Sequence, residues 1–473
     1  MIGAYLSNVM AQGVGRFMTM SANFAAFVLF ARVFGPDILG KYMFILSFIA
    51  VAGVLVEFGT TSVMAKQLVQ VRRNEDQLYW GNFLVLRIFI YLVFLGPILG
   101  IAFILRSDLF IYLLWCTLAL PFLASRFFEP VYQIYNRPWY SALSNGCYSI
   151  AWFLVILVII YFFSTMEGII IGYLFSNILY TLLAFYLALF LLRPKLRINI
   201  DCIKKILILA FPLWVSSIFS MLNIRISIFM LSSMQSDIAV GLYSVPFRFF
   251  EMAATLGMVL MYPLVPIFSK IAQSDLATLK KIFARILESV AITIMPVAIM
   301  APLFTETIIQ FFFGPKFVET TSTLNVIVWI GMLLFLNLLS SALNLSLGVV
   351  RHGYWNTALA LILIVTLNYI WIPEYGYLGC AWSALVSEFL LFCITLFYSL
   401  KSIGNFINYL KWFYILGANA VFFVCLYYNV LNLHFAINII LAVCIYIAII
   451  FLTKLIDKSA LTSIYDQVKA NNC

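Results

Sequence analysis

Uninterrupted apolar segments recur along the whole chain and limit the structures that it can form. Residues 153–163 and 439–451 contain no charged side chain and no polar face at helical spacing. Of the 473 residues, 65% are hydrophobic and only 10% are charged, which is more apolar surface than a soluble core can bury. The sequence therefore predicts a polytopic membrane protein and argues against a large soluble helical protein.

The apolar segments have the length of membrane-spanning helices. A window of about 20 residues suits a hydrocarbon layer of about 30 Å, and it divides the chain into about fourteen spans. The expected spans are 10–32, 38–61, 80–104, 109–131, 139–163, 168–192, 205–232, 239–268, 285–313, 323–349, 355–372, 377–399, 411–429 and 434–452. Their hydrophobicity is continuous and does not alternate, so we expect an all-α fold.

The distribution of Lys and Arg between the loops predicts the orientation. Basic residues collect in every second loop and in the carboxyl-terminal tail, whereas the opposite loops carry only Arg32, Lys41, Arg106 and Lys316. Loops rich in Lys and Arg stay in the cytoplasm, so both termini are predicted to be cytoplasmic. The net charge of +10 reflects this bias and some attraction to anionic lipid, and it requires no nucleic-acid partner.

A weak internal repeat relates the two halves of the chain. Asn23 corresponds to Asn223, and the segment 37–42 corresponds to 237–243, at an offset of about 200 residues that suits a duplicated transporter. Six spans return the chain to its starting side, so the two lobes must be parallel repeats. We expect an N-lobe at residues 1–200, a C-lobe at 201–404, and an appended helix pair with a cytoplasmic tail at 405–473.

The chain offers no constellation for covalent chemistry. Its 8 cysteines and 2 histidines are scattered without metal-ligand spacing. The segment Gly35 to Lys41 nearly spells a phosphate-binding loop, but Tyr42 stands where the magnesium-holding Ser or Thr is needed and no strand precedes it. We therefore predict no enzyme activity, no metal, no cofactor and no nucleotide partner.

Charged residues inside the spans are the candidate functional residues. Even a lenient insertion scale assigns Arg about 2.5 to 3.5 kcal/mol at a helix centre, so such residues must face protein, water or a ligand. Two polar stripes at helical spacing carry them: Gln12, Arg16, Thr19 and Asn23 in the first span, and Ser244, Arg248, Glu251 and Thr255 in the eighth. The stripes suit the wall of a water-filled cavity, and they predict substrate binding at Arg16, Asn23 and Arg248.

Alternatives stay open for each of these residues. Arg16 can extend to the cytoplasmic interface, and Arg248 can be neutralised by Glu251 three residues later. Arg225 joins the cationic set by its location, although it points away from the polar face of its own helix. Glu57 and Glu251 are predicted for either ion coupling or charge pairing. Glu57, Glu288 and Glu388 are single carboxylates within spans, mostly near helix ends, and an interfacial position is favoured over ion coupling for them.

Two turns, the twofold layout and the appended pair give the chain a family resemblance. The turns are Phe34-Gly35-Pro36-Asp37-Ile38-Leu39-Gly40-Lys41-Tyr42 and Phe313-Gly314-Pro315-Lys316-Phe317. The pattern resembles the Wzx-type O-antigen and polysaccharide flippases of the multidrug, oligosaccharidyl-lipid and polysaccharide (MOP) transporter superfamily. The resemblance implies two lobes around a cationic cavity that opens alternately to the two sides of a bacterial inner membrane.

The same resemblance implies the substrate and the partners. The substrate would be an O-antigen or capsule repeat unit linked to undecaprenyl pyrophosphate, and a glycan polymerase and a chain-length regulator would act beside the flippase. Arginine suits this substrate because it binds phosphate groups bidentately. A multidrug or cation antiporter of the same superfamily and a flippase for lipid II-type precursors remain the alternatives. A membrane-bound glycosyltransferase would need a large catalytic loop, which the sequence lacks.

Overall fold

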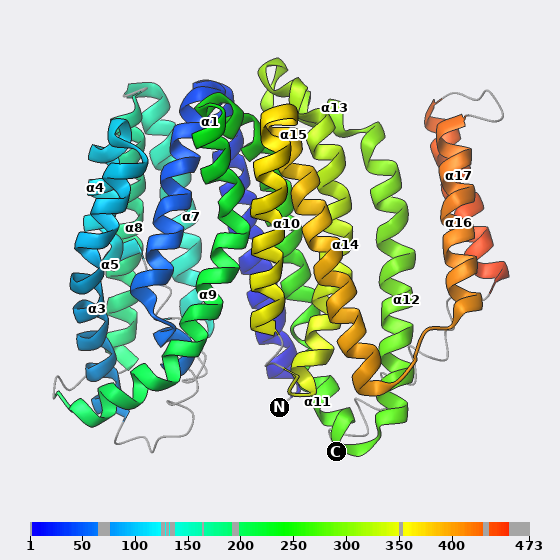
Figure 1. Cartoon of the computed structure of the whole chain (residues 1–473), viewed down its shortest axis with the longest axis horizontal. Coiled ribbons are helices and arrows are strands. Elements are labelled where there is room, and N and C mark those ends of the chain that lie inside the picture. The colour runs from blue at the N-terminus through cyan, green and yellow to red at the C-terminus, as the bar shows by residue number, and fades with distance from the viewer. Residues whose placement is uncertain are drawn as a thin grey trace. The chain divides into compact units, whose positions relative to one another are not determined.

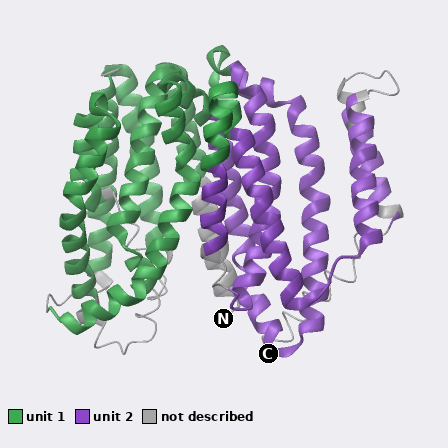
Figure 2. Ribbon diagram, viewed as in Figure 1, with its two compact units in different colours: residues 1–244, 312–317, 365–380 green, residues 245–311, 318–364, 381–473 purple. Residues whose placement is uncertain are grey.

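The computed structural model describes residues 2–64, 76–123, 128, 132, 138–162, 165–191, 198–349, 353–428 and 435–453, and the side chains of residues 2–18 lie outside this description. Every regular element in these ranges is helical. The residues group into two compact units, which Figure 2 colours separately: unit 1 comprises 1–244, 312–317 and 365–380, and unit 2 comprises the remainder. The predicted lobe boundaries, 1–200, 201–404 and 405–473, remain a prediction.

Unit 1 contains the first half of the helices, which run from blue to green in Figure 1. They are α1 (Ile2–Glu57), α3 (Asp76–Leu105), η1 (Ser107–Leu109), α4 (Phe110–Leu118), α5 (Leu120–Leu123), α7 (Pro138–Phe162), α8 (Met166–Leu191), α9 (Ile200–Met234) and the start of α10 (Asp237–Met261). Trp80, Phe83, Tyr140, Tyr180 and Ala210 form one buried cluster that joins α3, α7, α8 and α9.

Unit 2 contains most of the later helices. They are the remainder of α10, α11 (Leu264–Ser274), α12 (Leu276–Met300), η3 (Ala301–Leu303), most of α13 (Thr305–Phe313), the end of η4 (Pro315–Thr320), α14 (Thr321–Ser346), the outer parts of α15 (Gly353–Ile403), α16 (Tyr409–Tyr428) and α17 (Phe435–Leu452). Phe268, Phe283, Leu339 and Phe406 form its main core. The carboxyl-terminal pair packs on α12, where Tyr446 Oη donates to Ile292 O at 2.8 Å.

Two long helices are each broken by a glycine in a backbone conformation that other residues avoid. In α1, Gly35 has φ 74° and ψ −177°, and in α15, Gly376 has φ 57° and ψ −133°. A positive φ is costly for residues with a Cβ atom, so glycine is needed at both breaks. Each break separates two expected spans, 10–32 from 38–61 and 355–372 from 377–399.

The length and hydropathy of the helices confirm the predicted fold class. Within the described ranges, 10 helices are long and apolar enough to cross a membrane, and Ser107–Leu118 and Leu441–Ile450 are shorter apolar helices. α1 and α15 each contain two spans, which makes twelve, and the two shorter apolar helices bring the number to about fourteen. The protein is therefore an all-α polytopic membrane protein. The expected span 285–313 begins earlier, at Leu276, where the Asp275 side chain caps α12 by accepting the Ala277 amide at 2.8 Å.

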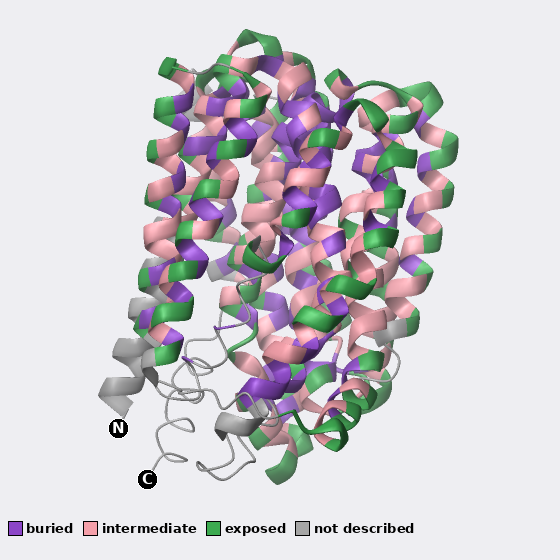
Figure 3. Ribbon diagram, turned by 90° about the vertical axis from the view of Figure 1, so that its left-hand side faces the viewer, coloured by how far each residue is buried: buried purple, intermediate pink, exposed green. Residues whose placement is uncertain are grey.

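Large apolar side chains lie on the outer surfaces of the helices. Tyr161 is 82% exposed, Ile104 is 81% exposed and Trp355 is 77% exposed. Figure 3 shows exposed residues at mid-height on the helices as well as at their ends. In water such a surface would be unfavourable, whereas lipid chains are as apolar as these side chains.

Candidate functional site

The predicted cationic residues lie on three different helices. Arg16 is in α1, but its side chain lies outside the described part, whereas Asn23 is described and partly buried on the same helix. Arg225 is partly buried in α9. Arg248 lies in α10, within unit 2. Their joint role as a substrate-binding set therefore remains a prediction.

Arg248 and Glu251 form an ion pair within one turn of α10. Arg248 Nη1 donates to Glu251 Oε2 at 2.7 Å, and the two side chains are 27% and 21% exposed. Thr255 Oγ1 donates to the Glu251 carbonyl at 2.8 Å, so three members of the predicted stripe are in contact along the helix. The pairing that the i, i+3 spacing offered as an alternative is therefore present, and both charges stay partly accessible.

Glu57 ends α1 and belongs to unit 1. Thr60 Oγ1 donates to the Glu57 carbonyl at 2.6 Å and helps to end the helix. Whether Glu57 serves charge pairing or ion coupling remains a prediction.

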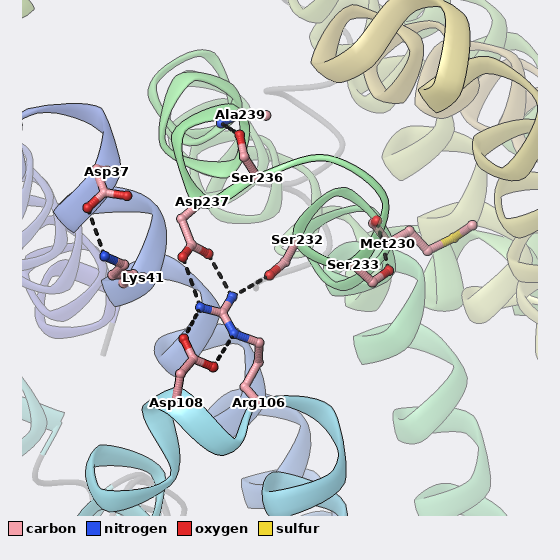
Figure 4. Close-up of polar contacts among 10 residues, drawn as sticks. All are labelled: Asp37, Lys41, Arg106, Asp108, Met230, Ser232, Ser233, Ser236, Asp237 and Ala239. Carbon is pink, nitrogen blue, oxygen red and sulfur yellow. Dashed lines mark hydrogen bonds and ion pairs between the residues drawn. The ribbon is translucent and has the colours of Figure 1, made fainter.

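A set of ion pairs in the described part of unit 1 is centred on Arg106, between α3 and η1. Arg106 Nε and Nη2 donate to the two Asp108 oxygens at 2.8 and 2.7 Å, and Nη1 and Nη2 donate to the two Asp237 oxygens at 2.7 and 2.8 Å. Nη1 also donates to Ser232 Oγ at 2.7 Å. Figure 4 shows the side chains converging on the guanidinium group. We call Arg106, Asp108, Ser232 and Asp237 the Arg106 cluster.

Burial and charge strengthen the Arg106 cluster. The side chains of Arg106 and Asp237 are only 16% and 14% exposed, and the guanidinium carbon lies 5.2 Å from the centroid of the Phe44 ring. Hydrogen bonds to Asp108 and Asp237 raise the pKa of Arg106, and the bond from Arg106 lowers the pKa of Asp108. Both ions are thus held in their charged forms, as the bidentate geometry requires.

Local capping places Asp237 for this contact. The chain turns between α9 and α10, where Ser233 Oγ donates to the Met230 carbonyl at 3.0 Å and Ser236 Oγ accepts the Ala239 amide at 3.2 Å (Figure 4). The second bond satisfies an amide that the first turn of a helix leaves without a partner. The turn therefore presents the Asp237 carboxylate from the first residue of α10.

The two copies of the repeated turn pack against each other through glycine. A Cβ atom on Gly40 would lie 1.8 Å from the Asp237 carbonyl oxygen, and one on Gly241 would lie 1.9 Å from the Pro36 carbonyl oxygen. Beside this contact, Lys41 Nζ and Asp37 Oδ2 form an ion pair at 2.8 Å. Only glycine allows the two backbones to come this close. The repeat seen in the sequence therefore marks a contact between its own two copies.

The sequence contained the members of the Arg106 cluster without indicating that they meet. Arg106 was one of the few basic residues in the sparsely charged loops, and Asp237 was a landmark of the repeat. They are 131 positions apart, and no sequence pattern predicts that separation. Among the described residues, no group of three or more His, Cys, Asp or Glu side chains is arranged to hold a metal ion.

The helical spans and their exposed apolar surfaces define a polytopic membrane protein. Residues 5–272 match the family model described as polysaccharide biosynthesis protein, and the chain belongs to that family. No curated protein matches the chain.

Solved structures share the fold at low sequence identity. The lipid II flippase MurJ in an inward closed conformation matches with a TM-score of 0.72 and 16% identity, covering 95% of this chain and 100% of that chain. A multidrug resistance MATE family transporter of the MOP superfamily, in an inward-facing conformation, has a TM-score of 0.66 and 14% identity and covers 84% and 98%. A MOP superfamily transporter from Pyrococcus furiosus has a TM-score of 0.58 and 15% identity and covers 85% and 96%. These matches confirm the predicted superfamily fold.

Proposed function

We propose that this protein is a flippase for lipid-linked oligosaccharides in a bacterial inner membrane. Its substrate would be an O-antigen or capsule repeat unit on undecaprenyl pyrophosphate, and both protein termini would be cytoplasmic. The observation that carries the proposal is the combination of a polysaccharide biosynthesis family with the fold of lipid and drug transporters. The proposed reaction moves the substrate across the membrane and leaves its covalent bonds unchanged.

The pyrophosphate headgroup is the part of the substrate that needs the arginines. Two linked phosphates carry negative charge, which is costly in hydrocarbon unless cations or water accompany it. Arg16, Arg225 and Arg248, with Asn23, would supply the path. Arg248 is suited to this role because its partner Glu251 is a single carboxylate on a partly exposed surface, which an incoming phosphate can replace.

An apolar cavity is lined by residues that directly follow Arg248 in the sequence, and it is consistent with a substrate that has an apolar part. Phe249, Phe250 and Ala253 of α10 line a cavity of about 180 Å³ together with side chains of α12 and α14, including Val297 and Phe335. Apolar cavities of about 150 Å³ stay dry and bind hydrocarbon. A prenyl segment could occupy this cavity while its charged headgroup is bound through Arg248.

The Arg106 cluster would hold one side of the transporter closed. The positive-inside count assigns its loops to the outer side of the membrane. Opening that side requires the turn between α9 and α10 to leave α1 and η1, which breaks the Arg106–Asp237 pair and the glycine contact. A state in which both are formed would be closed toward the outside, and separation of these elements would release the substrate there.

A reconstitution assay tests the proposal. Liposomes containing the protein would be loaded with fluorescent undecaprenyl-pyrophosphate-linked oligosaccharide, and the fraction reached by an external reagent would be followed over time. We expect the fluorescent lipid to become accessible to the reagent faster than in protein-free liposomes. Unlabelled lipid-linked glycan should slow this movement by competition. If the protein moves lipid II and not the oligosaccharide, it is a flippase for lipid II-type precursors. If it moves only a cationic drug in exchange for ions, it is an antiporter. Either result would overturn the proposal.

A further inference from the structure

An intramembrane carboxylate in unit 2 lies away from the sites discussed so far. Glu388 is in the second part of α15, midway between the break at Gly376 and the end of the helix at Ile403. Its carboxylate belongs to the central part of an apolar helix, where ionisable residues are costly and usually functional.

Glu388 is bound by an amide and not by a cation. Asn337 Nδ2 of α14 donates to Glu388 Oε1 at 2.7 Å. The Asn337 oxygen in turn accepts from Thr395 Oγ1 at 3.0 Å and from Ser341 Oγ at 3.4 Å. In the part of the chain that the structure describes, the hydrogen-bonding partners around the carboxyl group are therefore all neutral.

The hydrogen bonds continue along both helices. Asn344 Nδ2 donates to the Thr395 carbonyl at 2.9 Å, and Ser399 Oγ donates to Asn344 Oδ1 at 3.2 Å. We call this set the polar seam: Asn337, Ser341 and Asn344 on α14, and Glu388, Thr395 and Ser399 on α15. Spacings of three, four and seven residues keep each group on one helix face.

The direction of the polar seam follows from the helix ends. Asn344 is close to Ser346, where α14 ends, and Ser399 is close to Ile403, where α15 ends. Lys401 and Lys411 follow on that side, which the positive-inside count assigns to the cytoplasm. The polar seam thus extends from the carboxyl group toward the predicted cytoplasmic surface.

Glu388 forms no ion pair with a neighbouring helix in the described part of the chain. Neither α14 nor residues 355–364 of α15 contain an ionisable side chain. The ionisable residues on the other packed elements are Arg248 and Glu251 on α10, Lys270 on α11, and Lys280, Lys281, Arg285 and Glu288 on α12. None of them forms an ion pair with Glu388 in the described ranges, and Glu288 pairs with Lys411 at 3.1 Å.

We propose that Glu388 is a proton-binding site and that the polar seam connects it to the cytoplasmic side. A carboxylate at this position is penalised by its apolar surroundings, whereas the neutral acid can still accept the Asn337 amide hydrogen bond. The Glu388 carboxylate binds one proton and later releases the same number, so the step forms and breaks only one O–H bond and needs no other reactant. The second part of the proposal, which rests on the proposed function, is that this proton couples a proton gradient to flipping.

Chemical labelling tests the protonation without requiring any substrate. Dicyclohexylcarbodiimide reacts with protonated carboxyl groups in apolar surroundings, and mass spectrometry of peptides locates the adduct. We expect an adduct on Glu388 at neutral pH that declines as the pH is raised, and its loss in Glu388→Gln. Glu306→Gln is the matched control, because Glu306 is exposed on α13 and its removal should not change the labelling. Absence of an adduct on Glu388 in the wild type would overturn the proposal.

Sodium distinguishes a proton site from a metal-ion site. If sodium chloride suppresses labelling at constant pH and potassium chloride does not, Glu388 binds sodium and the proton proposal is wrong. Unchanged labelling in both salts supports it. Asn337→Leu should increase the labelling at high pH, because it removes the hydrogen bond that stabilises the carboxylate.

Transport in liposomes tests the coupling separately. We expect a pH gradient to accelerate flipping by the wild type and to have no effect on Glu388→Gln. A gradient response that survives in Glu388→Gln would overturn the coupling. If the wild type moves no lipid-linked glycan at all, the proposed function fails, while the labelling result still decides whether Glu388 binds a proton.

Discussion

At the scale of the residue, Arg106 is an arginine whose hydrogen-bond donors are all used. The five N–H groups of Arg106 reach Asp108, Asp237 and Ser232, and the planar guanidinium also lies over Phe44. Lysine carries the same charge but cannot form two bidentate pairs. The position therefore requires the shape of the guanidinium group as well as its charge.

Replacing Arg106 by lysine should destabilise the protein. Arg106→Lys loses bonds to a largely buried carboxylate, and removal of a partner that leaves a polar group unsatisfied costs about 1–3 kcal/mol. We expect a lower melting temperature for the purified protein in detergent. Arg32→Lys is the control, because Arg32 is exposed and donates to a carbonyl, that of Phe312, at 2.6 Å. Equal melting temperatures for Arg106→Lys and the wild type would contradict the prediction.

The pH dependence of the Asp108 contribution is fixed by its lowered pKa. The bond from Arg106 lowers the pKa of Asp108 below its ordinary 3.8, so its stabilising effect is present above that value and is lost as the pH falls through the lower folded-state value. Asp108→Asn should therefore lower the melting temperature by a constant amount from pH 8 to about pH 5. The effect should be small, because the Asp108 side chain is 57% exposed. A difference that disappears near neutral pH would show that another group is responsible.

At the scale of the element, the apolar helices were predictable and their contacts were not. Hydropathy located the spans because each one must satisfy its backbone and face lipid over a fixed thickness. Hydropathy did not predict the start of α12, because the helix begins with the amphipathic segment 276–284, which is less apolar than the remainder. The pairs Arg106–Asp237 and Asn337–Glu388 join different helices, and helix periodicity carries no information about a partner on another helix. Arg248–Glu251 was predictable because both residues lie on one helix.

Enlarging either packed glycine should separate the two turns. In Gly40→Ala, the added methyl group would lie 1.8 Å from a backbone carbonyl oxygen, which cannot move as a side chain would. We expect the turn between α9 and α10 to be displaced, and surface glycan to fall in cells that depend on this protein. The displacement can be followed with a reporter cysteine, Ile238→Cys, in a background without other cysteines. This cysteine should react faster with an external thiol reagent when Gly40→Ala is also present than when it is not.

Gly53→Ala is the matched control for this experiment. Gly53 also lies in α1, and nothing stands within 4 Å of an added Cβ atom. Alanine is a better helix former than glycine by about 1 kcal/mol, so this variant should be as stable as the wild type or more so. If Gly40→Ala shows normal glycan export and an unchanged reaction rate of the cysteine at position 238, then close packing of Gly40 against the Asp237 backbone is not required.

At the scale of the whole molecule, an anionic headgroup must cross a layer of hydrocarbon, and the charges along its path determine the cost. An inside-negative membrane potential favours outward movement of negative charge by about 2.3 kcal/mol per elementary charge per 100 mV. The arginines would lower the barrier, and a proton on Glu388 would add a second source of energy. The sequence predicted the arginines as a set, but which of them contact substrate depends on helix rotation, which composition does not determine.

Neutralising the cationic path should stop export without affecting insertion. We expect Arg248→Ala, and also Arg16→Ala, to abolish surface glycan at protein levels equal to the wild type, because the pyrophosphate loses its bidentate partner. Lys401→Ala is the control, since this exposed cation at the end of α15 is outside the proposed path. Surface glycan is measured by gel and antibody staining. Undiminished glycan in both arginine variants would leave Arg248–Glu251 as a structural ion pair only.

The reciprocal glycine contact has a consequence for how the two turns can change. Gly40 meets the backbone at Asp237, and Gly241 meets the backbone at Pro36, so each copy of the repeat supplies a glycine that the other copy requires. A side chain at either position would meet a backbone carbonyl oxygen of the other turn. The two turns therefore constrain each other, and neither glycine can be replaced without moving the opposite turn.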